Sequence, residues 1–311
     1  MRAATRENRF GWRDGRTTPL RRGPPGFTLV ELLVVLGILS VLMAALLPAL
    51  TQARRQARSI VSVENQRQIT AAVNCFASDN DNRYPPSVAT IGFGDDWNWQ
   101  EPTMLTGYLK RSPSTHRAMS SYLRAYIEDA SVMFCPNAPL RYKYLQRAWQ
   151  AGEDWDNPDT EAKPDALSGV YCFYWNYVGY LGGRRGLFRG PSGPVRGYRE
   201  STIIVTDYFG YDHWRSLNAY GSCEEFREAE ITEGTGISSA YWSRARGGAG
   251  TAPDWDRLRV KLHAGYVDGH VEAYFPSDTI PMAVICDTEL NEPYTRGMGP
   301  GTFYLPRVGL R

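Results

Sequence analysis

The sequence lacks the short motifs that would assign it to one of the common enzyme classes. It contains no P-loop, no H-E-x-x-H, no G-x-S-x-G and no protein-kinase signature, and its glycine-rich segment 182–186 does not have dinucleotide-binding spacing. Only four histidines are present, and no local pattern links one of them to a nucleophile. We therefore expect the protein not to be an enzyme and to need no cofactor.

Cysteine is sparse, and its spacing excludes the common zinc patterns. The chain has five cysteines and no C-x-x-C pair, so we expect no metal site built on them. Because five is an odd number, at least one thiol is unpaired in a monomer. A disulfide between Cys135 and Cys172 and buried free thiols are both compatible with the spacing, and we expect free thiols for most of the five.

The chain has no large net charge, but its charge is unevenly placed. The total is +2, whereas residues 1–26 carry seven arginines against Glu7 and Asp14, a net of +5 that leaves −3 for the rest. The arginines are Arg2, Arg6, Arg9, Arg13, Arg16, Arg21 and Arg22. A mildly acidic body lacks the basic surface typical of nucleic-acid-binding proteins, so we expect no nucleic-acid partner.

What the sequence does contain is a long hydrophobic run near its N-terminus. The run extends from Leu32 to Leu47, is followed by Pro48, and with its flanks is long enough for a helix to cross a bilayer core of about 30 Å. Glu31 lies at its start, where an ionisable side chain is costly and indicates a functional role. The basic segment before the run predicts a cytoplasmic N-terminus and an exported body.

These residues resemble the N-terminus of the type IV pilins and the type II secretion pseudopilins. The shared features are a basic leader ending in Gly26, Phe27 as the first mature residue, Glu31 as the fifth, an apolar helix, and a helix-breaking Pro48. The resemblance implies that a prepilin peptidase cuts after Gly26 and that the new Phe27 amine is methylated. It also implies that the helix assembles with those of other pilin-like subunits.

The resemblance suggests a partner for Glu31. Pairing Glu31 of one subunit with the Phe27 amine of its neighbour is favoured in a low-dielectric medium over leaving either charge alone. The alternative is that Glu31 reaches the nearby lipid headgroups. Pro48 either marks a place where the helix loosens on entering a filament or only kinks a membrane helix.

An ordinary secretory signal peptide is the competing interpretation of the N-terminus. The small residues Ala44, Ala45 and Ala49 would then lie near its cleavage site. That interpretation places Glu31 at a costly position in the apolar region and leaves the segment from Gly26 to Glu31 without a purpose. We therefore favour the pilin-like interpretation.

The helical pattern continues beyond Pro48 to about residue 80. Small and apolar residues recur every three or four positions and predict a narrow stripe that packs on a globular head. They are Ala49, Ala53, Ala57, Ile60 or Val61, Ile69, Ala72 or Val73, and Phe76. Residues 79–86 are predicted to form a turn. We expect a removed leader at 1–26, a helix at 27–80 that is transmembrane to 50 and amphipathic from 51, and an exported head at 85–311.

The head is predicted to contain antiparallel β-sheet and long loops, so the expected fold class is α+β. Expected strands are 169–177, 201–208, 258–266 and 270–275, with a helix within 114–130. Asp268-Gly269 predicts a two-residue turn between the last two strands, since both residues tolerate positive φ. His263, Asp268 and His270 could instead bind a metal, but their alternation across a turn favours a structural hairpin.

The same hairpin is similar to the H…DG signature in the heads of a large bacterial group of pilin-like proteins. His263, Asp268 and Gly269 match it, although His263 lies closer to Asp268 than is usual there. The other similar segments are Phe134-Cys135-Pro136, Tyr174 to Tyr180 and Thr202 to Asp207.

Aromatic residues of the head allow two interpretations. They are Trp97, Trp99, Trp155, Tyr174, Trp175, Tyr177 and Tyr180. We expect them to fill the core, and the alternative is that they offer stacking surfaces to sugars or single-stranded nucleic acid.

Together these features predict a structural subunit, a pseudopilin or minor pilin of a type II secretion or type IV pilus-like filament. The expected location is the bacterial inner membrane, in a single pass with the head in the periplasm, before or after incorporation into a filament. The alternative is an exported carbohydrate-binding or hydrolytic head on a pilin-like anchor.

Overall fold

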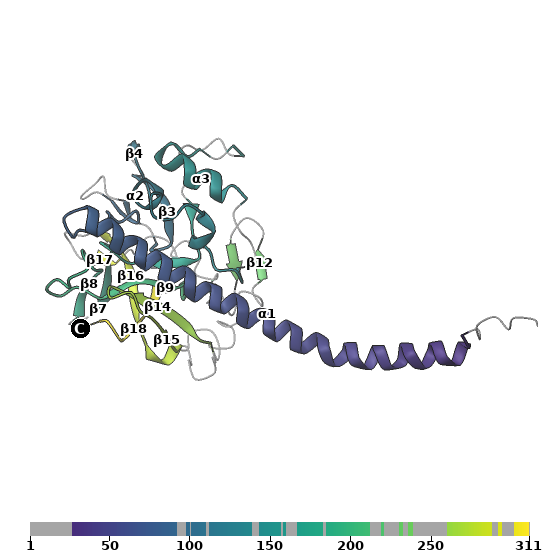
Figure 1. Cartoon of the computed structure of the whole chain (residues 1–311). Coiled ribbons are helices and arrows are strands. Elements are labelled where there is room, and N and C mark those ends of the chain that lie inside the picture. The colour runs from purple at the N-terminus through teal and green to yellow at the C-terminus, as the bar shows by residue number, and fades with distance from the viewer. Residues whose placement is uncertain are drawn as a thin grey trace, which may run out of the picture. The chain divides into compact units, whose positions relative to one another are not determined.

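One long helix, α1 (Leu29–Asp79), precedes a β-rich head (Figure 1). The computed structural model of the chain describes residues 27–91, 98–99, 101–109, 112–138, 143–156, 158–159, 167–182, 185–211, 219–220, 230–232, 236–238, 260–287, 292–293 and 302–310. By internal contacts the chain divides into two units, Met1–Thr51 and Gln52–Arg311. The leader 1–26 lies outside the described residues.

The described part of the first unit is apolar helix whose side chains are all exposed. By length and composition α1 can cross a membrane. The helix continues through Pro48 without interruption. Two hydroxyls in this stretch donate to carbonyls of the preceding turn, Ser40 to Leu36 at 2.7 Å and Thr51 to Pro48 at 2.7 Å. Both donors are therefore satisfied within the helix.

The head is built from antiparallel sheets, and every strand pair that the structure describes is antiparallel. The largest sheet has, in spatial order, β11 (Ala219–Tyr220), β10 (Gly210–Tyr211), β18 (Thr302–Pro306), β16 (Thr279–Asp287), β7 (Val178–Gly182) and β8 (Gly186–Arg189), with β17 (Glu292–Pro293) on β16. The four-stranded sheet has β15 (Val271–Tyr274), β14 (Leu262–Tyr266), β9 (Ile203–Asp207) and β6 (Tyr171–Phe173). The remaining strands are β4 (Ser112–Ala118), β3 (Met104–Leu109) and β5 (Leu167–Ser168) in one sheet, the pair β1 (Thr90–Ile91) and β2 (Asn98–Trp99), and the pair β12 (Glu230–Thr232) and β13 (Gly236–Ser238). The α+β fold class expected from the sequence is confirmed.

Short helices of the head differ from the prediction. The helix expected within 114–130 is wrong for its first part, because residues 112–118 form β4 and pair with β3. Tertiary pairing here overrides a local helical pattern. The helical segments are α2 (Ser120–Leu123), α3 (Leu145–Ala151) and the 3₁₀ turns η2 (Ala130–Met133), η3 (Gly152–Asp154) and η7 (Pro276–Asp278).

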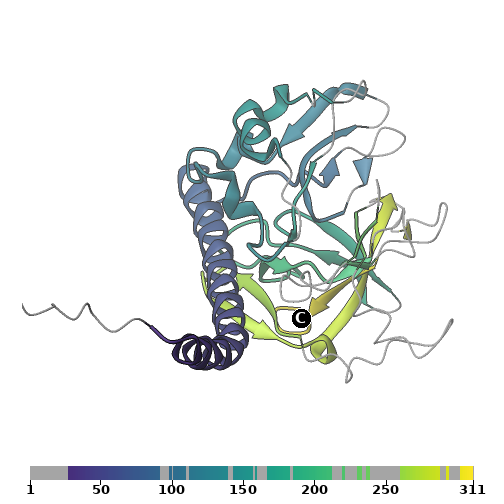
Figure 2. The ribbon, with the colours of Figure 1, turned by 90° about the vertical axis from the view of Figure 1, so that its right-hand side faces the viewer.

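The second half of α1 packs along one side of the head (Figure 2). Its buried residues are Ser62, Asn65, Gln66, Ile69, Thr70, Ala72, Val73 and Ala77. The predicted apolar stripe is therefore correct from Ile69 onward and wrong before it, since Ala49, Ala53, Ala57, Ile60 and Val61 are exposed. The helix comes close to β14 at Gly265, where an added Cβ would lie 2.6 Å from the Thr70 hydroxyl.

The helix ends in the turn that the sequence predicts. Asp81 and Asn82 adopt positive φ, of 53° and 58°, which Asx residues tolerate better than most. The Asn82 amide donates to the Ala77 carbonyl at 2.8 Å, so the turn satisfies one of the last helical carbonyls.

The β14–β15 hairpin is present, but its turn has three residues. The Gly269 amide donates to the Tyr266 carbonyl at 2.9 Å, and the Tyr266 amide donates to the His270 carbonyl at 3.0 Å. Gly269 has φ of +90°, whereas Asp268 is not among the residues with positive φ. The predicted two-residue turn is therefore wrong, because a turn closed by a glycine bulge takes one more residue.

The core also decides two questions that the spacing left open. Cys172 is a buried free thiol and Cys135 is disulfide-bonded, so a bridge between these two is wrong. Burial raises the pKa of the Cys172 thiol, which keeps it protonated and unreactive. Four of the seven aromatic residues singled out above lie in the core, namely Trp155, Tyr174, Trp175 and Tyr177.

Candidate functional site

The start of α1 is closed by a reciprocal pair of contacts between Thr28 and Glu31. The Glu31 carboxylate accepts from the Thr28 amide at 2.9 Å and from the Thr28 hydroxyl at 2.8 Å, both through Oε2. The Glu31 amide in turn donates to the Thr28 hydroxyl at 3.3 Å. A Thr at the helix N-cap with a Glu three residues on is a capping box, which satisfies donors that the first turn leaves open.

The sequence suggested two partners for Glu31, the Phe27 amine of a neighbouring subunit and the lipid headgroups. The structure adds a partner within the same chain, because Thr28 binds the carboxylate. Both contacts use Oε2, and Oε1 has no hydrogen-bond partner among the described residues. The capping box therefore holds the carboxylate in place next to Phe27, which is 75 % exposed.

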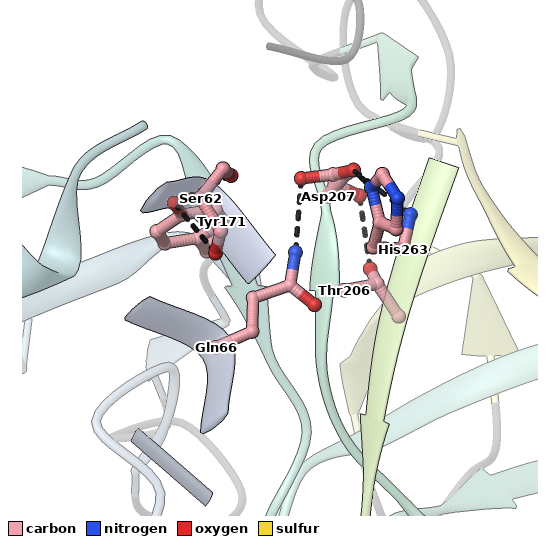
Figure 3. Close-up of polar contacts among 6 residues, drawn as sticks. All are labelled: Ser62, Gln66, Tyr171, Thr206, Asp207 and His263. Atoms are coloured by element: carbon pink, nitrogen blue, oxygen red, sulfur yellow. Dashed lines mark hydrogen bonds and ion pairs between the residues drawn. The ribbon is translucent and has the colours of Figure 1, made fainter. Parts of the chain in front are cut away.

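A second cluster of polar contacts joins α1 to the four-stranded sheet (Figure 3). Asp207, at the end of β9, is 2 % exposed and accepts from Gln66 Nε2 at 2.9 Å through Oδ1. Its Oδ2 accepts from the His263 amide at 2.8 Å and lies 3.2 Å from His263 Nδ1. Buried polar groups need such partners, because an unpaired one costs about 1–3 kcal/mol.

Nearby polar groups add to this cluster, and together these contacts form a polar seam between α1 and the head. The Ser62 hydroxyl lies 2.8 Å from the Tyr171 hydroxyl, and Asn65 Nδ2 donates to the Phe134 carbonyl at 3.1 Å. Burial raises the pKa of Tyr171, so its phenol stays neutral at physiological pH. The seam thus ties one face of α1 to three separate segments of the head.

The hydrogen bonds of the seam join its polar residues to one another and to nearby backbone groups. The hydroxyl beside the carboxylate, on Thr206, donates to the Asp207 carbonyl at 2.9 Å and so is not directed at His263. The sequence pointed to the strand ending in Asp207 through a resemblance, but it did not predict Gln66 as its partner. The signal that could have found it is the pair of amides at 65 and 66 on the helix face that continues to Ile69.

The hairpin residues singled out from the sequence have different partners. His263 contacts Asp207, whereas the Asp268 carboxylate binds the backbone amide and Nδ1 of His270. Desolvation by itself raises the pKa of Asp268, but the hydrogen bonds and the charge of His270 together outweigh it, so the pKa is lowered. Gly269 closes the turn. Within the described residues, no group of three His, Cys, Asp or Glu side chains is arranged to hold a metal ion.

Comparison with protein families gives a match at the N-terminus. The family described as "Prokaryotic N-terminal methylation motif" matches residues 21–47. This range contains Gly26, Phe27 and the capping box, and it extends to the end of the apolar run. The chain fits a prepilin-like protein.

The prepilin-like motif implies, in general terms, processing by a prepilin peptidase and assembly with other pilins. With the apolar helix it also suggests membrane anchoring. The match ends before the head begins. Comparisons of the chain with curated proteins and with solved structures gave no match.

Proposed function

We propose that the protein is a structural subunit, a pseudopilin or minor pilin, of a type II secretion or type IV pilus-like filament. The observation that carries the proposal is the methylation motif at residues 21–47, on the part of α1 whose apolar side chains are exposed. A helix with apolar residues all round needs lipid or other helices to cover it. The membrane before assembly and neighbouring subunits after it supply such cover.

The head has the role of an exported body in this proposal. A disulfide at Cys135 fits an oxidising compartment such as the periplasm, where such bonds persist. The large head favours a minor or tip position over that of a major subunit, and we propose no enzymatic role for it.

Glu31 is the proposed assembly residue, paired with the methylated Phe27 amine of a neighbouring subunit. The capping box supports this role because it fixes the carboxylate through Oε2 and does not use Oε1. Cutting after Gly26 creates the amine one residue before Thr28. Pro48 is proposed as the place where the helix loosens in the filament.

Mass analysis of the N-terminus of the protein purified from its host tests the proposal. We expect the chain to begin at Phe27 and to carry one extra methyl group. An intact leader, or a chain that begins beyond Ala44 as after signal-peptidase cleavage, would contradict it.

A further inference from the structure

The head contains a pocket of about 630 Å³ beside the β7–β8 hairpin. This volume is within the range of sites that bind small organic ligands. Its apolar lining consists of Leu181, Leu187, Phe188, Ile280 and Leu310. Its polar lining consists of Ser201 and four arginines, Arg185, Arg189, Arg199 and Arg307, and none of the described residues that line it is acidic.

None of the four guanidinium groups forms an ion pair with a carboxylate in the part of the chain that the structure describes. The acid nearest in sequence, Glu200, is used elsewhere, because its carboxylate accepts from the Ser192 amide and hydroxyl and from the Gly197 amide. Four like charges around one pocket repel each other unless an anion lies among them. The chain after residue 26 has a net charge of −3, so this concentration of positive charge is local.

The chemistry of the lining defines the occupant. The planar fork of Arg matches carboxylate, sulfate and phosphate groups. A bare inorganic anion would not use the apolar walls, so the charged group belongs to a larger body with C–H surface. Tyr198, the neighbour of Arg199 in the sequence, is 86 % exposed, and the centroid of its ring lies 5.2 Å from the Arg199 guanidinium carbon. An exposed aromatic ring next to a cation suits an acidic sugar ring.

Single-stranded nucleic acid fits the site less well. Binding of that kind uses a row of aromatic rings on which successive bases stack. The aromatic ring of the lining, Phe188, is 1 % exposed and packs edge-to-face on Tyr174, so it cannot stack on a base.

We propose that this pocket binds an acidic saccharide, a sugar that carries a carboxylate, sulfate or phosphate group. The inference gives a location to a carbohydrate-binding role for the head, and it does not depend on processing after Gly26. An uncut leader would leave this inference intact, and a head that binds no sugar would leave the filament proposal intact.

Calorimetric titration of the full chain in a non-ionic detergent without a sugar headgroup tests the proposal. The probes are a uronic-acid trisaccharide, a sulfated disaccharide, a neutral trisaccharide, inorganic sulfate and phosphate, and a single-stranded oligodeoxynucleotide. We expect an acidic saccharide to bind at least about tenfold more tightly than the neutral one, because one charged hydrogen bond contributes that much. We also expect this binding to weaken as the salt concentration rises. It should also bind more tightly than the inorganic ions and the oligonucleotide.

Charge reversal locates the site. The double substitution Arg189→Glu and Arg307→Glu should abolish saccharide binding, and the milder Arg185→Gln should weaken it. The control is Arg147→Glu, at an exposed arginine on α3 away from the pocket, which should leave binding unchanged. Thermal unfolding checks that each variant is folded.

Several results would overturn the proposal. They are no saccharide binding, equal binding of the neutral sugar, equal binding of inorganic sulfate or phosphate, and tighter binding of the oligonucleotide. An equal loss of binding in the Arg147→Glu control, or full binding by folded variants with changed pocket arginines, would also overturn it.

Discussion

The two halves of α1 belong to one helix, but the first half exposes its apolar side chains and the second half buries a face that contains polar ones. In the first half the side chains are mostly apolar and all exposed, whereas in the second half the buried face begins with Ser62, Asn65 and Gln66. Exposed apolar residues need a partner from outside the chain, while the buried polar residues already have partners within it. The first half is therefore open to partners from outside the chain, and the second half attaches the helix to the head.

The largest expected effect is on assembly, in the first half. Glu31→Gln removes the charge of the side chain. It preserves the capping box, because the amide oxygen of Gln can accept the same hydrogen bonds. We expect it to reduce filament incorporation strongly in the host, measured by the amount of subunit in sheared filaments. Thr28→Val is the matched variant, which keeps the charge and removes the capping hydroxyl, and it should reduce incorporation less.

The reverse order would show that Glu31 acts through the helix start and not through its charge. Full incorporation of Glu31→Gln would remove the proposed pairing with the Phe27 amine. Normal processing of both variants, read from N-terminal mass, separates assembly from cleavage.

The next effect is on stability, in the second half. Ile69 is 0 % exposed and Ile60, nine residues earlier on the same helix, is 70 % exposed. Ile69→Ala should lower the free energy of unfolding of the head by about 3 kcal/mol, because it leaves a cavity in the core. Ile60→Ala should change it by less than about 0.5 kcal/mol.

Urea unfolding of the chain in a non-ionic detergent, followed by tryptophan fluorescence, measures both variants. Equal effects at the two positions would contradict the division of α1 into an exposed and a packed half.

The smallest expected effect separates two glycines. An added Cβ at Gly265 would lie 2.6 Å from the Thr70 hydroxyl and 2.9 Å from Val205, whereas at Gly37 it meets nothing within 4 Å. Gly265→Ala should destabilise the head by about 1–3 kcal/mol, since it presses the helix away from β14. Gly37→Ala should leave the unfolding of the head unchanged, and a loss there comparable to that at Gly265 would contradict the close approach.

The head shows how a whole-chain property can hide a local one. The mild negative charge after residue 26 led us to expect no strongly basic surface, and yet four arginines line one pocket. They are spread from residue 185 to residue 307 and line one pocket because the fold brings together β8, the segment that follows it and the C-terminal segment after β18. A sum over the chain cannot show where charges gather.

Features that depend on neighbouring residues could be predicted from the sequence alone. The motif at 21–47, the length of α1, its end near residue 80 and the β14–β15 hairpin all follow from contiguous patterns, because hydrophobic run length, capping and turn chemistry act over a few residues. Only the tertiary structure decided that Gln66 meets Asp207 across 141 residues, that His263 joins them, and that β4 is a strand. The physical reason is that a buried amide or carboxylate is stabilised by whichever partner the fold brings to it, and local sequence does not specify a partner so far along the chain.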